Sequence, residues 1–301
     1  MTAIMSWPQR VLVDQLYYGS MVRFPWLAPS LSVAVARGLG ALPGSIAVTV
    51  AGNARLALGP TASDAQVRLT VDTILRGMQD SIRDTLLSDR EDVESLRARV
   101  TGFRGQDGYY RARARGGGLL LASIHMGAFE PCLALLRKYE RRVHVLFQPD
   151  PMPRFERARS RLRRSVGVIE HRLSDGLDAW IALRDALEAG ETVVMHADRV
   201  MKQQQGARMP FLGLGDALLP TGPVRLALGC GASILPTYCR TEGGGLFVEM
   251  DEPIWHGREM LRNSEVSTHP AQRCLVASME RAIRACPEQW MAFWNLKGEP
   301  K

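Results

Sequence analysis

The chain has 301 residues, a formal net charge of +7 and five scattered cysteines. At this length, one large domain or two smaller ones can bury a core without disulfides or a structural metal. No C-x-x-C pair occurs, which argues against a disulfide framework or zinc site and favours a reducing, cytoplasmic compartment. Arginine supplies most of the positive charge, and its planar fork favours acidic partners: nucleic acid, anionic lipid or an acidic carrier protein.

The first hundred residues are predicted to be helical. Apolar residues recur there at three-and-four spacing over 8–22, 30–42 and 63–87. No secretory signal pattern is present. The apolar stretch 31–52 is interrupted by an arginine, a proline and glycines, so it makes a poor membrane span. With the aromatic residues that precede it, this stretch could lie on a bilayer, or the aromatics could pack a helical layer onto the core.

From Gly118 onward, short apolar strands alternate with helical patterns, which predicts an α/β fold with a central, mainly parallel sheet and flanking helices. A loop is expected over 102–108 and 111–115, before the first strand. The expected strands are 119–124, 143–147, 166–169 and 192–197, and the expected helices are 126–139, 155–164 and 175–188. The chain is interpreted as a single domain, 1–301, with a helical portion (1–110) and an α/β portion (111–301).

The second half of the α/β portion has three further predicted features. A long polar loop is expected over 198–215, and loops of this length are usually functional. A helix should begin at Thr221, and 233–240 with 246–250 should form a hairpin at the sheet edge, where Pro236 fits best. Helices are expected over 270–285 and from 287 to 290.

His125 is the strongest candidate for catalysis. It follows a strand and precedes a helix, which is where open α/β sheets place their chemistry. Glu130 falls in the first turn of that helix, so its carboxylate is expected to curl back towards the imidazole, which would act as a general base. The chain lacks G-x-S-x-G, so the substrate's own hydroxyl or amine would be the nucleophile. The alternative is a histidine that only fills the core.

This stretch resembles the His-x-x-x-x-Asp/Glu signature of glycerolipid acyltransferases. In particular, it resembles the bacterial lipid A late-acyltransferase branch of the lysophospholipid acyltransferase superfamily. Further landmarks follow in the order of that family: Gln148–Pro153, Gly190–Val194, Pro210–Gly213, Thr221–Pro236 and Pro287–Trp290. The resemblance covers about residues 45 to 297.

The resemblance implies acyl transfer from a thioester on acyl carrier protein or coenzyme A to a hydroxyl of a lipid or glycolipid. It implies His125 as base and Glu130 as its partner. Arg199 is a candidate for stabilising the oxyanion, and the alternative is that Asp198 and Arg199 only hold the loop. The basic pair that lipid A enzymes carry near their C-terminus is missing, so a less anionic acceptor is expected, with Trp294 lining an acyl or sugar surface.

A basic segment over 154–164 contains six arginines in eleven residues. A helix would turn several of them to solvent, where they could dock a carrier protein, a coenzyme phosphate or an anionic membrane surface, unless they form only a solvated face. Nucleic acid is not expected, because no recognisable binding module accompanies the arginines.

Together these patterns predict a peripheral acyltransferase on the cytoplasmic face of the bacterial inner membrane, with no metal or other cofactor. The competing hypotheses are a non-catalytic lipid- or carrier-binding protein of the same fold and an acyl-thioester hydrolase. The predicted catalytic residues are His125, Glu130 and Arg199. The predicted substrate-binding residues are Gly127, Asp198, Arg154, Arg163, Arg164 and Trp294.

Overall fold

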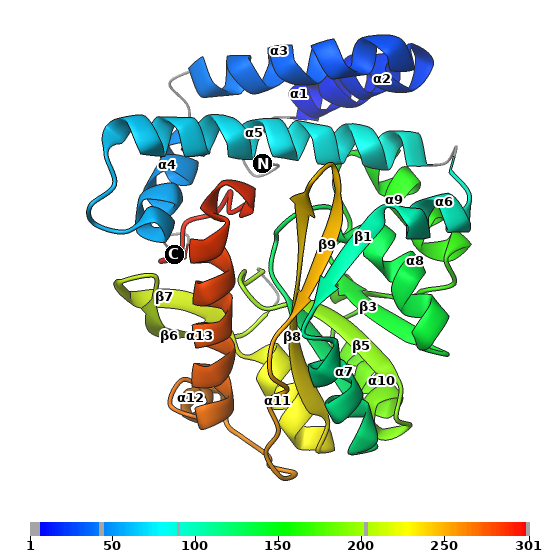
Figure 1. Ribbon diagram of the computed structural model, residues 1–301, viewed down its shortest axis with the longest axis vertical. Coiled ribbons are helices and arrows are strands. Elements are labelled where there is room, and N and C mark those ends of the chain that lie inside the picture. The colour runs from blue at the N-terminus through cyan, green and yellow to red at the C-terminus, as the bar shows by residue number, and fades with distance from the viewer. Residues whose placement is uncertain (1–6, 42–44, 89–90, 202–203, 299–301) are drawn as a thin grey trace.

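The computed structural model describes residues 7–41, 45–88, 91–201 and 204–298. Its centre is a seven-stranded sheet of order β1-β9-β8-β2-β5-β3-β4 (Figure 1). Neighbouring strands are parallel except for the antiparallel pair β8 and β9. The strands are β1 (Val100–Arg104), β2 (Leu119–Ser123), β3 (Val143–Phe147), β4 (Ile169–Arg172), β5 (Thr192–His196), β8 (Ser233–Glu242) and β9 (Gly245–Met250). The predicted α/β fold with a mainly parallel sheet is confirmed.

Helices cover both faces of this sheet. In β2, Leu119 and Leu121 join one apolar cluster, whereas Leu120 and Ala122 join another on the opposite face. The first cluster is completed by α6 (Val93–Ala98), α7 (Gln106–Ala114), α8 (Phe129–Tyr139) and α9 (Pro153–Ser165). The second is completed by α10 (Leu177–Glu188), α11 (Gly222–Cys230) and α13 (Pro270–Ala285). A strand buried on both faces needs no polar alternation, which explains the continuous apolar run of β2.

The N-terminal portion is a helical layer across one end of the sheet. In Figure 1, α5 crosses that end, and α1 to α3 stack on its far side. The layer comprises α1 (Trp7–Leu12), the π-helical η1 (Val13–Tyr18), α2 (Gly19–Arg23), η2 (Pro25–Leu27), α3 (Ala28–Ala41), α4 (Ser45–Leu58) and α5 (Asp64–Leu87). Across the described part of the chain, no helix combines the length and apolar character that a bilayer crossing requires.

The start of α5 follows from its local sequence. The Ser63 side chain accepts the backbone N–H of Gln66, and the Gln66 side chain accepts the backbone N–H of Ser63. Such a capping box satisfies backbone groups that the first helical turn leaves unpaired. The predicted helix over 63–87 is therefore confirmed, as are those over 30–42 and 270–285, within a few residues at their ends.

The loop predicted before the first strand is wrong, because β1 and α7 occupy it. β1 is an edge strand that pairs with β9 and is only partly buried, so it lacks the apolar run of the inner strands. Its Gly102 lies against the Phe247 ring, and a Cβ at that position would come within 2.7 Å of the ring carbons. The glycine that suggested a loop is therefore required for close packing between strands.

The hairpin of β8 and β9 is confirmed, but its predicted position at the sheet edge is wrong. Both of its strands have outer neighbours, since β9 pairs with β1 and β8 pairs with β2. Pro236 lies inside the sheet, at the point of β8 where hydrogen bonding to β2 ends and hydrogen bonding to β9 begins. Pairing with β2 extends to Pro236, and pairing with β9 begins at Thr237. The missing N–H of proline is tolerated there because one ladder ends as the other begins.

The polar segment predicted as a long loop over 198–215 contains β6 (Gly206–Phe211) and the start of β7 (Leu214–Pro220), which form an antiparallel hairpin. Met209, Phe211, Ala217 and Leu219 are buried at every second position. The strand predicted over 166–169 is shifted to β4, because Val166 and Val168 pack into the cluster beneath α9. Short elements complete the fold: η4 (Leu173–Asp175), α12 (Asn263–Val266) and η5 (Pro287–Gln289).

Candidate active site

His125 lies in the turn between β2 and α8, at the carboxyl end of the sheet. Since β2 and β5 are parallel neighbours with Ser123 opposite His196, two further residues in the same register bring Asp198 beside His125. Sheet register thus places an acidic and a basic side chain together, although 73 residues separate them.

Asp198 holds both the backbone and the ring of His125. Its carboxylate accepts the His125 backbone N–H at 2.9 Å and lies 2.8 Å from Nδ1 of the ring. The indole Nε1 of Trp290 donates to the same carboxylate at 3.0 Å. Burial alone would raise the pKa of Asp198, but the His125 and Trp290 contacts outweigh burial and lower that pKa to about 2. Asp198 is therefore ionised at any physiological pH.

An ionised carboxylate can only accept hydrogen bonds, so Nδ1 of His125 carries the ring proton and its N–H donates a hydrogen bond to Asp198. The lone pair of the neutral ring then lies on Nε2. The side chain of His125 retains 33% of its exposure and lines a cavity. This arrangement fixes the tautomer that a general base needs.

His196 stacks on His125, with ring centroids 4.2 Å apart and planes inclined by 22°. Burial is the main cause that lowers the pKa of His196 to about 3, and the neighbouring His125 contributes in the same direction. A second charge next to the His125 ring is thereby avoided. His196 is therefore suited to support the His125 ring and not to act as a second base.

The predicted contact between Glu130 and His125 is not what the structure shows. Glu130 is buried in the first turn of α8, and its carboxylate accepts a hydrogen bond from Nε of Arg159 on α9 at 2.7 Å. Nδ1 of His125 is engaged by Asp198 instead. The turn from His125 to Ala128 is not helical, so sequence spacing alone could not show where the Glu130 side chain would point.

Removing the Glu130 carboxylate is expected to cost stability rather than chemistry. Glu130→Ala would remove the hydrogen-bonded partner of Arg159, whose side chain is only 16% exposed, and this should lower the free energy of unfolding by about 3 kcal/mol, the low end for a broken buried pair. Replacing both residues with methionine should restore most of that loss, because no charge is then left without its partner. Denaturant unfolding of the two variants measures the difference. A stable Glu130→Ala protein that loses all transfer activity would contradict this expectation.

A cavity of about 340 Å³ opens at His125. Its wall combines the helical layer with the ends of the strands and the C-terminal segment. Its polar lining includes His125, Glu130, Arg159 and Arg199. Its apolar lining includes Tyr18, Met78, Ile82, Phe155, Met195, Phe293 and Trp294. A largely apolar cavity with a few convergent polar groups is typical of a substrate site.

Trp294 connects two of the predicted site residues. Its ring meets His125 edge-on at 5.0 Å between centroids, and the Arg199 guanidinium lies 5.1 Å from its ring centroid. The segment that carries Trp294 is anchored beside His125, because Met291 donates its backbone N–H to the His125 carbonyl at 2.8 Å. The structure therefore brings His125, Asp198, Arg199 and Trp294 to one place.

A family model described as bacterial lipid A biosynthesis acyltransferase matches residues 12–296. The chain belongs to this family. Family membership implies an acyltransferase that acts on lipid. No curated protein matches the chain significantly. The match includes the N-terminal helical layer, which contributes Tyr18, Met78 and Ile82 to the wall of the cavity.

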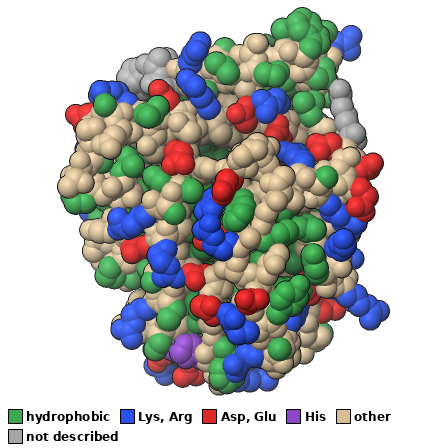
Figure 2. All heavy atoms as spheres, viewed as in Figure 1, with side chains coloured by type: hydrophobic (Ala, Val, Ile, Leu, Met, Phe, Trp, Pro, Cys, Tyr) green, Lys and Arg blue, Asp and Glu red, His purple; other side chains and the backbone are tan. Residues whose placement is uncertain are grey.

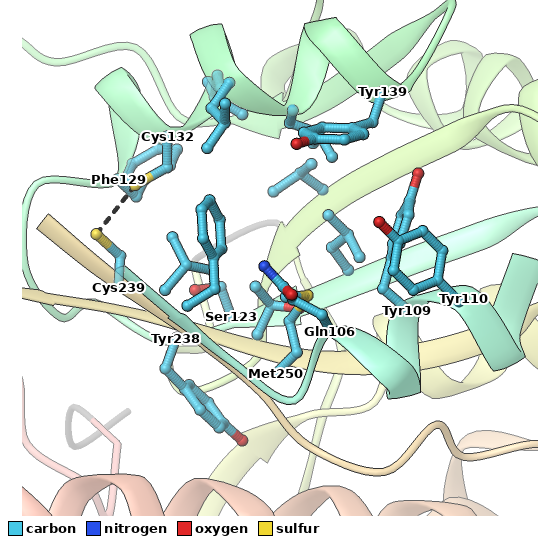
Figure 3. A pocket seen from close by; sticks show the side chains of 18 residues that line it. Gln106, Tyr109, Tyr110, Ser123, Phe129, Cys132, Tyr139, Tyr238, Cys239 and Met250 are labelled. Carbon is cyan, nitrogen blue, oxygen red and sulfur yellow. Dashed lines mark hydrogen bonds between the residues drawn. The ribbon is translucent and has the colours of Figure 1, made fainter. Parts of the chain in front are cut away.

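The acyltransferase has a second cavity, of about 120 Å³, on the face of the sheet that α7 and α8 cover. Figure 3 shows Phe129 and Cys132 at one end, with Tyr109, Tyr110 and Tyr139 at the other. Its lining is almost entirely apolar, and Ser123 of β2 contributes to it. Phe129 lines both cavities and meets His196 edge-on at 4.8 Å. This ring therefore separates the second cavity from the first.

Gly127 allows the turn that carries His125 to pass close to the backbone of β8. Gly127 has a φ of +62°, and a Cβ there would lie 2.4 Å from the Cys239 carbonyl oxygen. Only glycine permits both the left-handed backbone and this approach to β8. Because the Cβ position faces β8, the structure supports a backbone role for Gly127 and leaves its predicted substrate contact a prediction.

The basic segment forms α9, and its arginines differ in burial. Arg163 is fully buried and pairs with Glu156 and Glu170, so its prediction as an exposed docking residue is wrong. Arg154 is partly exposed and lies 3.5 Å from the buried Asp14 of the helical layer. Arg164 is largely exposed. Every third or fourth residue of the helix faces inward, which the arginine count alone could not reveal.

The sequence did not assign the roles of Asp198, Trp290 and Arg159. Asp198 was predicted to bind substrate, although it holds the histidine. One usable signal was its position two residues past the strand that pairs with β2. Trp290 and Arg159 offered no comparable signal, because their roles depend on tertiary contacts with Asp198 and Glu130.

Proposed function

We propose that the acyltransferase moves a fatty acyl chain from a thioester of acyl carrier protein or coenzyme A to a hydroxyl of a lipid or glycolipid. It would act as a peripheral protein at the cytoplasmic face of the inner membrane, and the reaction as written below uses no cofactor. The observation that carries the proposal is the pairing of His125 with the buried, ionised Asp198 at the wall of the larger cavity. This pair leaves Nε2 as the basic nitrogen of a side chain that lines the cavity.

In the proposed reaction, Nε2 of His125 takes the proton of the acceptor hydroxyl while its oxygen attacks the thioester carbonyl carbon. Asp198 stabilises the imidazolium that forms. The tetrahedral intermediate then collapses, the carbon–sulfur bond breaks, and the leaving thiolate takes the proton back from His125. The products are an ester and a free thiol, and His125 returns to its neutral form.

Arg199 and Trp294 are suited to hold the reacting groups. The Arg199 guanidinium is placed over Trp294, whose ring also contacts His125, so it can stabilise the oxyanion beside the base. The Trp294 Nε1 is buried and has no hydrogen-bond partner within the described chain. Buried donors normally have a partner, so this N–H supports a contact with an acceptor oxygen.

The second, apolar cavity fits the acyl chain of the donor. Its lining is mostly aliphatic and aromatic, and Phe129 also lines the catalytic cavity. A thioester carbonyl near His125 could therefore extend its chain past Phe129 between α7 and α8. Burial of each methylene contributes about 0.8 kcal/mol, so every methylene that enters this cavity would strengthen binding of the donor.

Reducing the second cavity should shorten the preferred chain. Ser123→Leu adds an apolar side chain to this cavity two residues before His125. The rate of transfer from a long-chain donor is expected to fall at least tenfold relative to the rate from a short-chain donor. This ratio corresponds to a loss of about 1.4 kcal/mol in the binding of the long chain. Competition between donors of different length measures the ratio, and activity with the short donor reports an intact site. Equal losses for both donors would contradict this assignment.

Exposed arginines of α9 are proposed to contact an acidic carrier protein. Arg157, Arg161 and Arg164 are exposed and lie on one side of the helix at four- and three-residue spacing. Changing all three to glutamate should raise KM for an acyl carrier protein donor at low salt, and the difference should shrink at high salt. Arg184→Glu, on α10 across the sheet, is the matched control. A salt-independent effect, or one shared by the control, would remove this role.

The proposed function is tested by incubating purified protein with a labelled acyl donor and a lipid extract. Labelled lipid supports acyl transfer. Labelled free fatty acid without labelled lipid would support a thioester hydrolase instead, with water in place of the hydroxyl. Donor binding without turnover would support a binding protein of the same fold.

A further inference from the structure

Exposed apolar side chains are concentrated in one part of the molecule. Seven of the large exposed hydrophobic residues fall within a 23-residue stretch of the N-terminal layer: Val11, Leu12, Leu16, Val22, Phe24, Trp26 and Val33. Leu16 is 61% exposed and Trp26 is 76% exposed. In Figure 2, hydrophobic side chains gather at the upper right, over the end of the molecule where α2 lies in Figure 1. Patches of this kind mark interaction surfaces.

The charges of the segment that precedes α5 are almost all positive. Up to Ser63, the sequence has one acidic residue, Asp14. Asp14 is buried, and it accepts the backbone N–H of Arg154 at 2.8 Å. Arg23 and Arg37 are exposed on α2 and α3. The surface of α1 to α3 therefore combines apolar side chains with positive charge, and the described residues before Ser63 present no exposed acid.

Arg23, Phe24 and Trp26 form the part of this surface most like a membrane anchor. They occupy the end of α2 and the short η2, and the Arg23 guanidinium lies 5.8 Å from the Phe24 ring centroid. Aromatic rings prefer the headgroup region of a bilayer, and arginine beside them can reach lipid phosphates. A tryptophan that is mostly exposed to water is otherwise unfavourable.

We propose that α1 to α3 dock on an anionic phospholipid bilayer, with Leu16, Phe24 and Trp26 in the interface and Arg23 and Arg37 at the lipid phosphates. The inference deepens the proposed function, since it names the surface that presents the active site to lipid. The same layer reaches the catalytic cavity: Tyr18 of η1 lines it, as do Met78 and Ile82 of α5, on which α3 packs. A lipid acceptor would then pass from the bilayer along this layer to His125.

A second copy of the chain is a poorer occupant. A symmetric contact through this surface would bring Arg23 and Arg37 of both copies to one interface without exposed acidic partners from α1 to α3. Like charges at an interface oppose association. Anionic headgroups supply the missing negative charge, so the charge pattern favours the bilayer.

The test is sedimentation with vesicles of phosphatidylethanolamine and phosphatidylglycerol, compared with vesicles of phosphatidylcholine alone. The full-length protein should bind the anionic vesicles preferentially. Leu16→Glu/Trp26→Glu should weaken binding about tenfold or more, and Arg23→Glu/Arg37→Glu should weaken it similarly, with a strong dependence on salt. Leu177→Glu, at a residue 72% exposed on α10, is the matched control and should bind like the parent protein.

Binding that does not distinguish the two vesicle types, or that the control loses equally, would overturn the proposal. So would a parent protein that ignores vesicles and dimerises through this surface, as sedimentation equilibrium would reveal. Vesicle binding does not require turnover. Bound protein that transfers no acyl group would therefore contradict the proposed function and leave the docking surface standing.

Discussion

His125→Ala is expected to lower kcat for acyl transfer by about 10²–10⁴-fold, the range that a positioned general base contributes. The His125 ring lies at the end of β2, and the buried Asp198 orients it through a hydrogen bond at Nδ1. Alanine removes the proton acceptor and leaves the hydrophobic walls of both cavities in place. KM for the donor should therefore change little, because the donor chain and carrier contact other residues.

The measurement is the initial rate with a labelled donor, and thermal unfolding shows whether the variant remains folded. His256→Ala, on the loop before α12 and outside both cavities, provides a histidine control. Full activity of His125→Ala would end the general-base mechanism. Loss of transfer with retained donor hydrolysis would show that water reaches the thioester without this base.

How far the sequence predicted this molecule depends on which interactions decide each feature. β3 was predicted at its observed bounds, and β2 to within one residue, because strands buried on both faces leave a continuous apolar run. β1 left no such signal. Its partly exposed edge position and its glycine against Phe247 make it resemble a loop until β9 is placed beside it.

The same distinction applies to the site. His125 was predicted because a strand-to-helix junction is a local pattern. Its partner was assigned to Glu130 by closeness in sequence, whereas Asp198 occupies that place through the register of β2 and β5. Register between strands that are distant in sequence is set by packing across the whole sheet, so composition and spacing cannot determine it.

The helix that carries the arginines shows a related limit. Its periodicity predicted a helix, but the orientation of that helix depends on α8 and β4. Glu170 of β4 pairs with Arg163, and Glu130 of α8 pairs with Arg159, so both arginines are turned inward. Buried ion pairs require partners from other elements, and those partners can be found only when the elements are placed.

Asp198→Asn tests the orientation of the base directly, and it should be nearly as damaging as loss of the histidine. Oδ2 of Asp198 accepts two N–H groups, from the His125 backbone and from Trp290. In the asparagine variant the amide oxygen should keep that place, which turns the amide NH₂ towards Nδ1 of His125. Nδ1 must then accept, so the ring proton moves to Nε2 and the base is lost.

The expected result for Asp198→Asn is a loss of about 10²–10⁴-fold in kcat, with little change in KM and a folded protein, because both backbone and indole hydrogen bonds persist. The double variant with His125→Ala should be no less active than His125→Ala alone, since the carboxylate acts only through the ring. Rates of the four proteins in one assay complete this cycle. If the two losses multiplied instead, Asp198 would have a separate role in catalysis, and its contact with His125 would not explain its effect.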